Sequence, residues 1–398
     1  MNAEAVLRYA LSHEVFNASG VIEATGLTRS TVIGLCDDLI ELGWINRLDD
    51  ARAAGEYRKG RPARRFELRA AAGFLVGVDA GEHSATAMVA DLRGRALGRV
   101  RRSFGNAGLD PVIRLSVMTD AVDSVLSDCG VPRAAVLATV VGIPAPTDTE
   151  GRSPIGHDGY WAKMNPNVSV AFSGYGRVVV ENDANLAAVA EQSIGAGQGT
   201  PSFAALLSGE RFGAGLIIDG ALIHGRHGGA GEMRALEVVD GVGSAVGLAA
   251  LARDWATAAR TPDTMAATSG SARLSPAEVT AEAVLTLAAE GHAPSIDIVE
   301  RLGDRLARVC FVLASMLDVE RVILVGAIAD AAGPIIDKAT AVLKRDFYAP
   351  IPEILPSTLG ADAVVLGAIQ RGLAMVQSAP LSFVLAVSHP APSISEIA

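Results

Sequence analysis

Two hydrophobic periodicities divide the chain near residue 70. Before that point, apolar residues recur every three or four positions, which predicts short helices. From Phe74 onward, apolar runs alternate with alanine-rich stretches, a pattern typical of an α/β protein. The chain has 398 residues, and single cores seldom grow beyond ~250 to 300 residues, so we expect two or three domains.

The apolar runs after residue 70 predict the strands of two α/β units. FLVGVDAG and SATAMVADLRGRALGRVRRSF predict a strand and then a hairpin that turns at Arg93-Gly94. Further strands are expected at AAVLATVVGIP, GRVVVEND, SFAALLSG, AGLIIDGALIHG and RVILVG, with helices near 243–258, 276–290 and 294–316. The small polar residues 256–276 indicate a surface loop. We place the domains at 1–70, 71–195, 196–376 with the C-terminal helix, and 377–398, a tail that could dock on the body or on a partner.

Residues 20–45, GVIEATGLTRSTVIGLCDDLIELGWI, have the spacing of a helix-turn-helix. We expect one helix to end at Thr25, a turn at Gly26, and Thr28 to cap a second helix. Its buried stripe is predicted to contain Val32, Leu35, Leu39 and Leu42, beside a buried Cys36. The outer face then presents Thr28, Arg29, Ser30, Thr31 and Gly34 to the DNA major groove. An ordinary helical hairpin is the alternative.

A basic segment follows. WINRL and RRFEL can pair as the wing of a winged helix, and RKGRPARR, residues 58–65, leads into the second strand with five basic residues out of eight. Gly-Arg-Pro is flat and extended, so Arg61 is expected in a narrow A·T-rich minor groove. The predicted phosphate contacts are Arg58, Lys59, Arg64 and Arg65. A solvated charged loop is the alternative, but beside a helix-turn-helix we interpret the segment as DNA-binding.

Overall charge limits the partners. The chain has 34 basic and 44 acidic residues, a formal net charge of -10, so any contact with double-stranded DNA must be local. The cysteines, Cys36, Cys129 and Cys310, lie far apart and match no disulfide or metal pattern, which favours a reducing cytoplasm. No apolar run reaches ~18 residues and the N-terminus does not resemble a signal peptide, so no membrane contact is expected.

Motifs of the larger region resemble, in order and spacing, those of the ROK family, named for repressors, open reading frames and sugar kinases. They are VGVDAGEHSATAMVADLRGRAL, VGIPAP, VVVENDANLAAVAE, FGAGLIIDGALIHGRHGGAGEM, RVILVG and STLGADAVVLGA. With the winged helix in front, residues 5 to 375 are similar to the family's transcriptional repressors, a group that includes xylose and N-acetylglucosamine repressors. The resemblance implies an α/β, actin-like (ribonuclease-H-like) fold of two lobes with a sugar between them. We expect a homodimer, or a dimer of dimers, and two helix-turn-helix units on a two-fold axis imply a palindromic operator. The expected position of Arg61 adds A/T-rich flanks to that operator.

The phosphate loops depart from those of the family's kinases. Where the kinases have Asp-x-Gly-Gly-Thr this chain has Asp79-Ala-Gly-Glu-His83, and Gly-Thr-Gly-x-Gly-Ala-Gly is replaced by Gly209-Glu-Arg-Phe-Gly-Ala-Gly215. The adenosine-side Gly-Gly pair reads Gly326-Ala327. Glu82 and Glu210 therefore bring negative charge to the place of a polyphosphate. Phosphoryl transfer depends on positioning and charge neutralisation, so we expect no kinase activity.

The family's zinc motif is also altered. Family members commonly have Gly-Glu-x-Gly-His followed by a cysteine run, and together these hold a structural zinc. Here the first element is Gly231-Glu-Met-Arg-Ala235, and the following LEVVDGVGSAVGLAAL contains no cysteine. A structural zinc needs about four Cys or His ligands, so we expect no zinc and no other cofactor.

VVVENDAN, residues 178–185, leads from an apolar strand into the helix LAAVAE. Asn182 and Asp183 could be helix caps only, but with Glu232 they also suit the neighbouring hydroxyls of a sugar-like ligand. His157, in a loop with Tyr160 and Trp161, is a further candidate. We therefore predict a regulator, specifically a repressor, of carbohydrate-related genes. The alternatives are an active ATP-dependent sugar kinase with Asp183 as its base, and a body that only dimerises.

Overall fold

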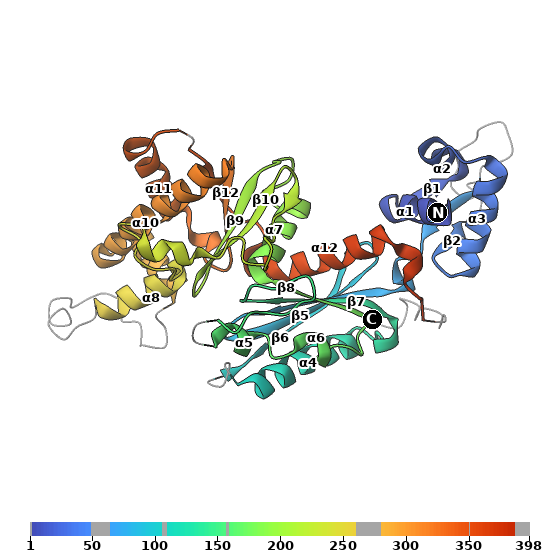
Figure 1. Cartoon of the computed structure of the whole chain (residues 1–398), viewed down its shortest axis with the longest axis horizontal. Coiled ribbons are helices and arrows are strands. Elements are labelled where there is room, and N and C mark those ends of the chain that lie inside the picture. Colours follow the sequence, from blue (N-terminus) through green and yellow to red (C-terminus); the bar gives the residue numbers. More distant parts are fainter. Residues whose placement is uncertain are drawn as a thin grey trace.

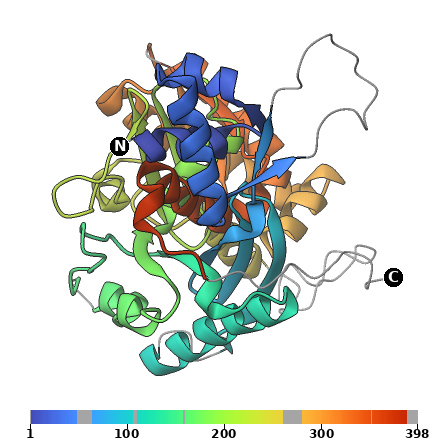
Figure 2. The ribbon, with the colours of Figure 1, turned by 90° about the vertical axis from the view of Figure 1, so that its right-hand side faces the viewer.

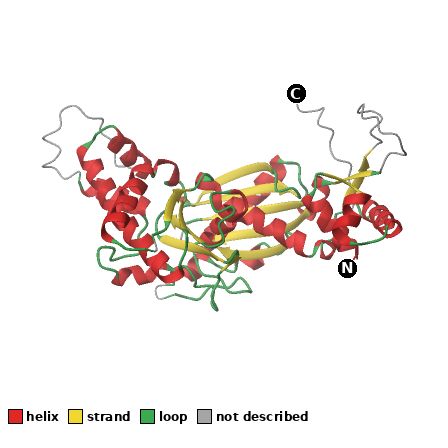
Figure 3. Ribbon diagram, turned by 90° about the horizontal axis from the view of Figure 1, so that it is seen from above, coloured by secondary structure: helices red, strands yellow, loops and turns green. Residues whose placement is uncertain are grey.

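The computed structural model describes residues 2–48, 64–105, 110–156, 159–259, 280–349 and 351–386. The molecule is elongated, with a small N-terminal domain at one end, the helices of a second lobe at the other, and a first lobe between them (Figures 1 and 3). Across the described residues, no helix is both long enough and apolar enough for a membrane span.

The N-terminal domain is a winged helix. Its helices are α1 (Asn2–Ser12), α2 (Ala18–Thr25) and α3 (Arg29–Glu41), and its sheet has the order β1 (Val15–Asn17), β3 (Arg65–Leu68), β2 (Ile45–Leu48). The first helix of the predicted helix-turn-helix ends where Gly26 adopts a left-handed φ of 70°, and the Thr28 hydroxyl accepts from the Thr31 amide at 3.3 Å. The predicted wing strands pair antiparallel, while the connection 49–63 lies outside the described residues.

The stripe that α3 buries is narrower than predicted and consists of Val32, Cys36 and Leu39. Leu35 is only half-buried, and Leu42 is 57% exposed, so the prediction for Leu42 was wrong. Leu42 follows the last helical residue, and the chain then turns at Gly43 with a φ of 80°. Trp44, after this turn, is buried in its place.

The two lobes share one sheet plan. In the first lobe, β4 (Phe74–Ala80) is central, antiparallel to β5 (Ser84–Asp91) and parallel to β7 (Val136–Ile143). The orders are β6-β5-β4-β7-β8 and β11-β10-β9-β12-β13, so both lobes run 3-2-1-4-5 in their own strands, as in ribonuclease H. The other strands are β6 (Ala96–Ser103), β8 (Arg177–Asn182), β9 (Phe203–Ser208), β10 (Phe212–Ile218), β11 (Ala221–Leu222), β12 (Arg321–Val325) and β13 (Glu353–Pro356).

Helices cover the outer faces of these sheets. In the first lobe α4 (Pro111–Asp128) packs on β5 and β6, and α5 (Tyr160–Met164) and α6 (Val168–Ala171) follow β7. The second lobe has α8 (Leu248–Ala258), α9 (Ala281–Ala289), α10 (Ala293–Leu317) and α11 (Gly333–Asp346). The helix expected over 243–258 therefore starts later, at Leu248. The loop expected over 256–276 falls mostly on residues 260–279, which lie outside the described residues.

Two helices lie between the sheets. They are α7 (Asp183–Ile194) and α12 (Ala363–Ser378), which pack against each other. In addition, α7 packs against β9 and β10, and α12 packs against β4 and β7. Gly367 permits this closeness, because a Cβ there would run into the Leu186 carbonyl. We expected the C-terminal helix to be part of the second lobe, but its sheet contacts are with the first.

The far end of α12 meets the N-terminal domain (Figures 1 and 2). Arg8 of α1 donates to the carbonyls of Gln377 at 3.1 Å and Ser378 at 2.6 Å, and Arg93 donates to the His13 carbonyl at 2.6 Å. One buried apolar cluster runs from α1 and α3 through β4 into α12. Phe383 is a buried member of this cluster, so the described part of the tail docks on the body.

Candidate functional site

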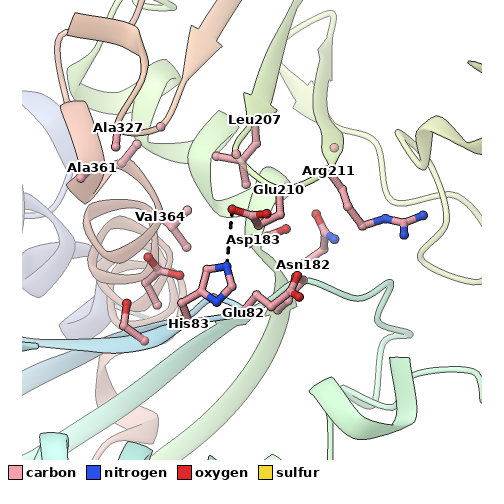
Figure 4. A pocket seen from close by; sticks show the side chains of 18 of the residues that line it. Glu82, His83, Asn182, Asp183, Leu207, Glu210, Arg211, Ala327, Ala361 and Val364 are labelled. Atoms are coloured by element: carbon pink, nitrogen blue, oxygen red, sulfur yellow. Dashed lines mark ion pairs between the residues drawn. The ribbon is translucent and has the colours of Figure 1, made fainter. Parts of the chain in front are cut away.

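A cavity of about 300 Å³ lies between the lobes. Its walls come from the turns after β4 and β9, from the β8–α7 junction and from the start of α12 (Figure 4). The polar side chains that line it are Asp79, Glu82, His83, Ser84, Arg101, Tyr160, Trp161, Asn182, Asp183, Glu210, Arg211 and Glu232. The structure thus brings together Asn182, Asp183 and Glu232, as well as the aromatic pair, while His157 lies outside the described residues.

At the β8–α7 junction, one residue caps the helix and the next one lines the cavity. Asn182 is the N-cap of α7, because its Oδ1 accepts from the Asn185 amide at 3.1 Å. Asp183 is the first helical residue, and its carboxylate accepts from the neighbouring Ala184 amide at 2.8 Å. The capping interpretation therefore holds for Asn182, while the Asp183 carboxylate lines the cavity without serving as the cap.

Buried Glu181 holds this junction in place through its hydrogen bonds. Its carboxylate, 5% exposed, accepts from the Asn182 amide and the Asn185 side chain at 2.9 Å and meets His224 Nε2 at 2.9 Å. Burial alone would raise the pKa of Glu181, but the hydrogen bonds from His224 and Asn185 hold it below its usual value. The sequence pattern did not predict a role for this glutamate. The amide-bearing residues one and four positions later were the available signal.

The acidic groups of the cavity are shifted towards protonation. Burial, with the nearby Asp79 carboxylate, raises the pKa of Asp183 to about 8. Burial also raises the pKa of Asp79 to about 7, against the opposing effect of Arg101 and Arg114. A carboxyl group that holds a proton near neutral pH can donate as well as accept a hydrogen bond, which suits a ligand rich in hydroxyls.

Glu232 reaches the cavity from the loop after β11. The loop forms a single bridge between Glu232 and Gly213 of β10. Gly231 has a φ of 83°, and a Cβ there would collide with the Ala214 carbonyl, so only glycine fits beside the strand. Burial raises the pKa of Glu232, although two neighbouring arginines oppose the shift.

The side chains at the phosphate loops are engaged with each other. Glu82 accepts from the Tyr160 hydroxyl at 3.1 Å. Glu210 lies 3.4 Å from His83 Nε2 (Figure 4) and 2.7 Å from the Arg253 guanidinium. The hydrogen bond from Arg253 holds the pKa of Glu210 below its usual value. Since His83 belongs to the first lobe and Glu210 to the second, this contact bridges the mouth of the cleft.

Arg114 supports the first phosphate loop from inside the protein. It is fully buried on α4 and donates to the carbonyls of Ala80, Gly81 at 2.8 Å and Met164 at 3.3 Å. Burial lowers the pKa of Arg114 to about 10, despite the favourable charges of nearby acidic groups. Sequence reasoning missed this residue, since one arginine on an amphipathic helix normally points to solvent.

The predicted DNA-contacting residues are only partly described. Thr28, Arg29 and Ser30 are exposed at the start of α3, and Thr31 is half-buried. Arg65 is exposed on β3, while the Arg64 guanidinium lies 3.8 Å from the Asp37 carboxylate of α3. The remaining three, Arg58, Lys59 and Arg61, lie outside the described residues. Gly34 is exposed, and a Cβ there would meet nothing in the chain.

Within the described ranges, no group of three or more His, Cys, Asp or Glu side chains is arranged to hold a metal ion.

Curated relatives include both regulators and kinases. The xylose repressor of Bacillus subtilis is 22% identical over 234 residues, which cover 58% of this chain and 59% of that protein. A glucokinase of Halalkalibacterium halodurans is 27% identical over 212 residues, covering 48% and 62%. The chain thus spans about three fifths of the length of these relatives.

Solved structures show the same two groups. A ROK family transcriptional regulator, described as a homologue of the Escherichia coli Mlc protein, superimposes with a TM-score of 0.67 at 17% identity, over 94% of this chain and 98% of that one. A ROK family glucokinase from Streptomyces griseus, in complex with glucose and AMPPNP, gives 0.60 at 26% identity, over 75% and 99%. Residues 75–373 match the family described as the ROK family. Because that match takes in most of the chain and both ribonuclease-H-like sheets, the protein belongs to the ROK family.

Proposed function

We propose that the protein is a DNA-binding transcriptional regulator, and specifically a repressor of carbohydrate-related genes, whose body senses a sugar-like ligand. The observation that carries the proposal is the joining of a winged helix to a ROK body through α12. The likeness to a ROK regulator over 94% of the chain supports it, since that coverage exceeds the matched residues 75–373.

Helix α12 would transmit ligand binding in the cleft to the N-terminal domain. Ala363 and Val364, at its start, line the cleft, and its last residues receive the hydrogen bonds of Arg8. Ligand binding at Asn182, Asp183 and Glu232 would close the lobes and shift the winged helices of a dimer relative to each other. DNA affinity can fall only as far as the ligand prefers the non-binding arrangement, by ~1 to 3 kcal/mol for ordinary coupling.

Selection of genomic fragments by the full chain, followed by fluorescence anisotropy, tests the DNA function. We expect a palindromic site, and Arg29→Ala should weaken binding to it by about tenfold, as removal of one good base contact does. Arg226→Ala is the matched control, since Arg226 is an exposed arginine of the second lobe. Absence of any selected sequence, or equal loss in both variants, contradicts the proposal.

Arg61 allows a finer test of the wing. Arg61→Ala should weaken binding chiefly to sites with A·T-rich flanks, because a narrow minor groove attracts an arginine. An equal loss on all flanking sequences would reduce Arg61 to a phosphate contact.

The second candidate is an active sugar kinase with an attached DNA-binding domain. The intact Asp183 and the likeness to a glucokinase with bound glucose and AMPPNP favour it. We propose instead that Glu82, His83 and Glu210 exclude the polyphosphate, since two of them are acidic and all three are engaged in contacts across the loops. ATP-dependent sugar phosphorylation that disappears in Asp183→Asn would establish the kinase, whereas no ATP binding at millimolar concentration would eliminate it.

A further inference from the structure

A second, smaller cavity of about 230 Å³ opens beside the sugar-facing groups. It shares Tyr160, Trp161, Arg211 and Glu232 with the main cleft, so the two spaces are contiguous. Its other walls are Gly156, Arg234 and Glu237, and none of the phosphate-loop acids Glu82 and Glu210 lines it. A ligand held at Glu232 could therefore extend one of its substituents into this side cavity.

Two arginines give the side cavity its chemistry, and both stand where the family motifs have glycine. Arg211 occupies the third position of Gly-Thr-Gly-x-Gly-Ala-Gly, and Arg234 the fourth of Gly-Glu-x-Gly-His. The two motifs lie more than twenty residues apart in the chain, yet their substituted positions line one cavity. This convergence distinguishes the site from a family-wide feature.

Both guanidinium groups are available to a ligand. Among the described residues, neither forms an ion pair or a hydrogen bond, and Arg211 only lies 6.0 Å from the Tyr160 ring centroid. Figure 4 shows the Arg211 side chain extending away from Asp183 and Glu210. Burial raises the pKa of Glu232, and the charges of Arg211 and Arg234 oppose that shift, so both arginines lie near the carboxyl that would hold the ligand.

We infer that Arg211 and Arg234 form an anion subsite, and that the effector is an acidic sugar derivative with a phosphate or carboxylate group. This inference rests on the proposed sugar-sensing function and deepens it. Asn182, Asp183 and Glu232 hold the hydroxyls, Tyr160 and Trp161 pack on the apolar face, and the anion receives the guanidinium groups. A planar guanidinium group matches the oxygen spacing of both a phosphate and a carboxylate. The two arginines therefore indicate an anionic group, and an experiment must distinguish a sugar phosphate from a sugar carboxylate.

Calorimetry with matched sugars tests the subsite. For glucose, galactose, mannose and N-acetylglucosamine, the neutral sugar is compared with its 6-phosphate and, for the first three, with its uronic acid. We expect one acidic member to bind at least about tenfold more tightly than its neutral parent, as charge-assisted hydrogen bonds usually require. Whether that member is the phosphate or the uronate identifies the source of the anion.

Arg211→Gln and Arg234→Gln should each weaken binding of the acidic member by about tenfold. Arg234 lines only the side cavity, so Arg234→Gln should leave binding of the neutral parent within about twofold. Arg226→Gln, an exposed arginine that lines neither cavity, should change nothing. Because both arginines are exposed, the variants should fold, and circular dichroism verifies it.

The contrary outcomes are distinct. A neutral sugar that binds as tightly as its acidic derivatives, or an acidic sugar unaffected by both arginine changes, overturns the subsite and leaves sugar sensing intact. If no sugar of either kind binds, the sensing function itself fails and the subsite with it. ATP binding that is lost in Arg211→Gln would reassign this arginine to a nucleotide.

Discussion

The two ends of the interlobe cleft differ in how their acidic side chains are engaged. At the sugar-facing end, Asn182, Asp183 and Glu232 line a common cavity. At the phosphate end the strands and turns are also in place, but Glu82 and Glu210 are occupied by Tyr160 and Arg253. Under the proposed function, the fold keeps the backbone of the phosphate loops while Glu82 and Glu210 place acidic side chains on them. Backbone similarity to a kinase is weak evidence for phosphoryl transfer.

The largest effect is expected from a change of Arg114, because its hydrogen bonds hold the backbone of the first phosphate loop. Arg114→Met should lower the free energy of unfolding by about 3 to 5 kcal/mol, since it removes a buried cation and leaves three carbonyls and nearby acids without their partner. Urea denaturation measures the change. Arg102→Met, at an exposed ion pair, should change it by less than about 1 kcal/mol. A similar small loss for Arg114 would mean that other contacts maintain the loop.

The next largest difference is expected in sugar affinity, which should depend on Asp183 far more than on Glu82. Asp183→Ala should weaken sugar binding by about a hundredfold, equivalent to ~3 kcal/mol, because a buried polar ligand group loses its partner. Glu82→Gly should leave sugar affinity within about threefold, which corresponds to less than ~0.7 kcal/mol. Calorimetry against the sugar found for the parent protein measures both, and circular dichroism confirms folding. Equal losses would show that the two ends act as one site.

Sequence patterns anticipated the parts of the molecule that depend on local spacing. The helix-turn-helix, the hairpin at Arg93-Gly94 and the strand–helix junction at Asn182 follow from caps, turns and alternation, which act within a few residues. What escaped prediction depends on distant partners. The buried Arg114 is explained by carbonyls from two other segments, and the His224–Glu181 contact joins residues 43 positions apart. No local pattern identifies such partners. Leu42 was misjudged because the helical period was extended past the true end of α3.

Protonation at the sugar-facing end gives a smaller, pH-dependent test. The pKa of Asp183, raised to about 8, lies above its ordinary value of about 3.9, so between these pH values the folded protein binds more protons than the unfolded chain. The free energy of unfolding should therefore fall as pH rises through this window. Asp183→Asn removes the Asp183 contribution to that dependence, while Asp79, whose pKa is raised to about 7, keeps its own. Relative to the parent, the variant should gain about 1 to 3 kcal/mol between about pH 5 and pH 8.5.

Urea denaturation at several pH values measures this gain, and Asp240→Asn, at an exposed position, serves as the control. If Asp183→Asn and the parent share one pH profile, the Asp183 carboxyl is well solvated and ionised in the folded protein. The stabilised variant should also bind sugar more weakly, which is the expected trade between stability and function at a polar site.

The smallest effect is expected at the contact that joins the lobes across the phosphate end. The His83 side chain is 68% exposed and lies 3.4 Å from Glu210, and exposed pairs of this kind contribute about 0 to 1 kcal/mol. His83→Ala should therefore change sugar affinity less than about twofold, because Glu210 keeps its closer partner Arg253 at 2.7 Å. Calorimetry at low and high salt measures this. A tenfold change would mean that the His83–Glu210 contact governs closure of the lobes, and then the residues at the phosphate end would control what Asn182, Asp183 and Glu232 bind.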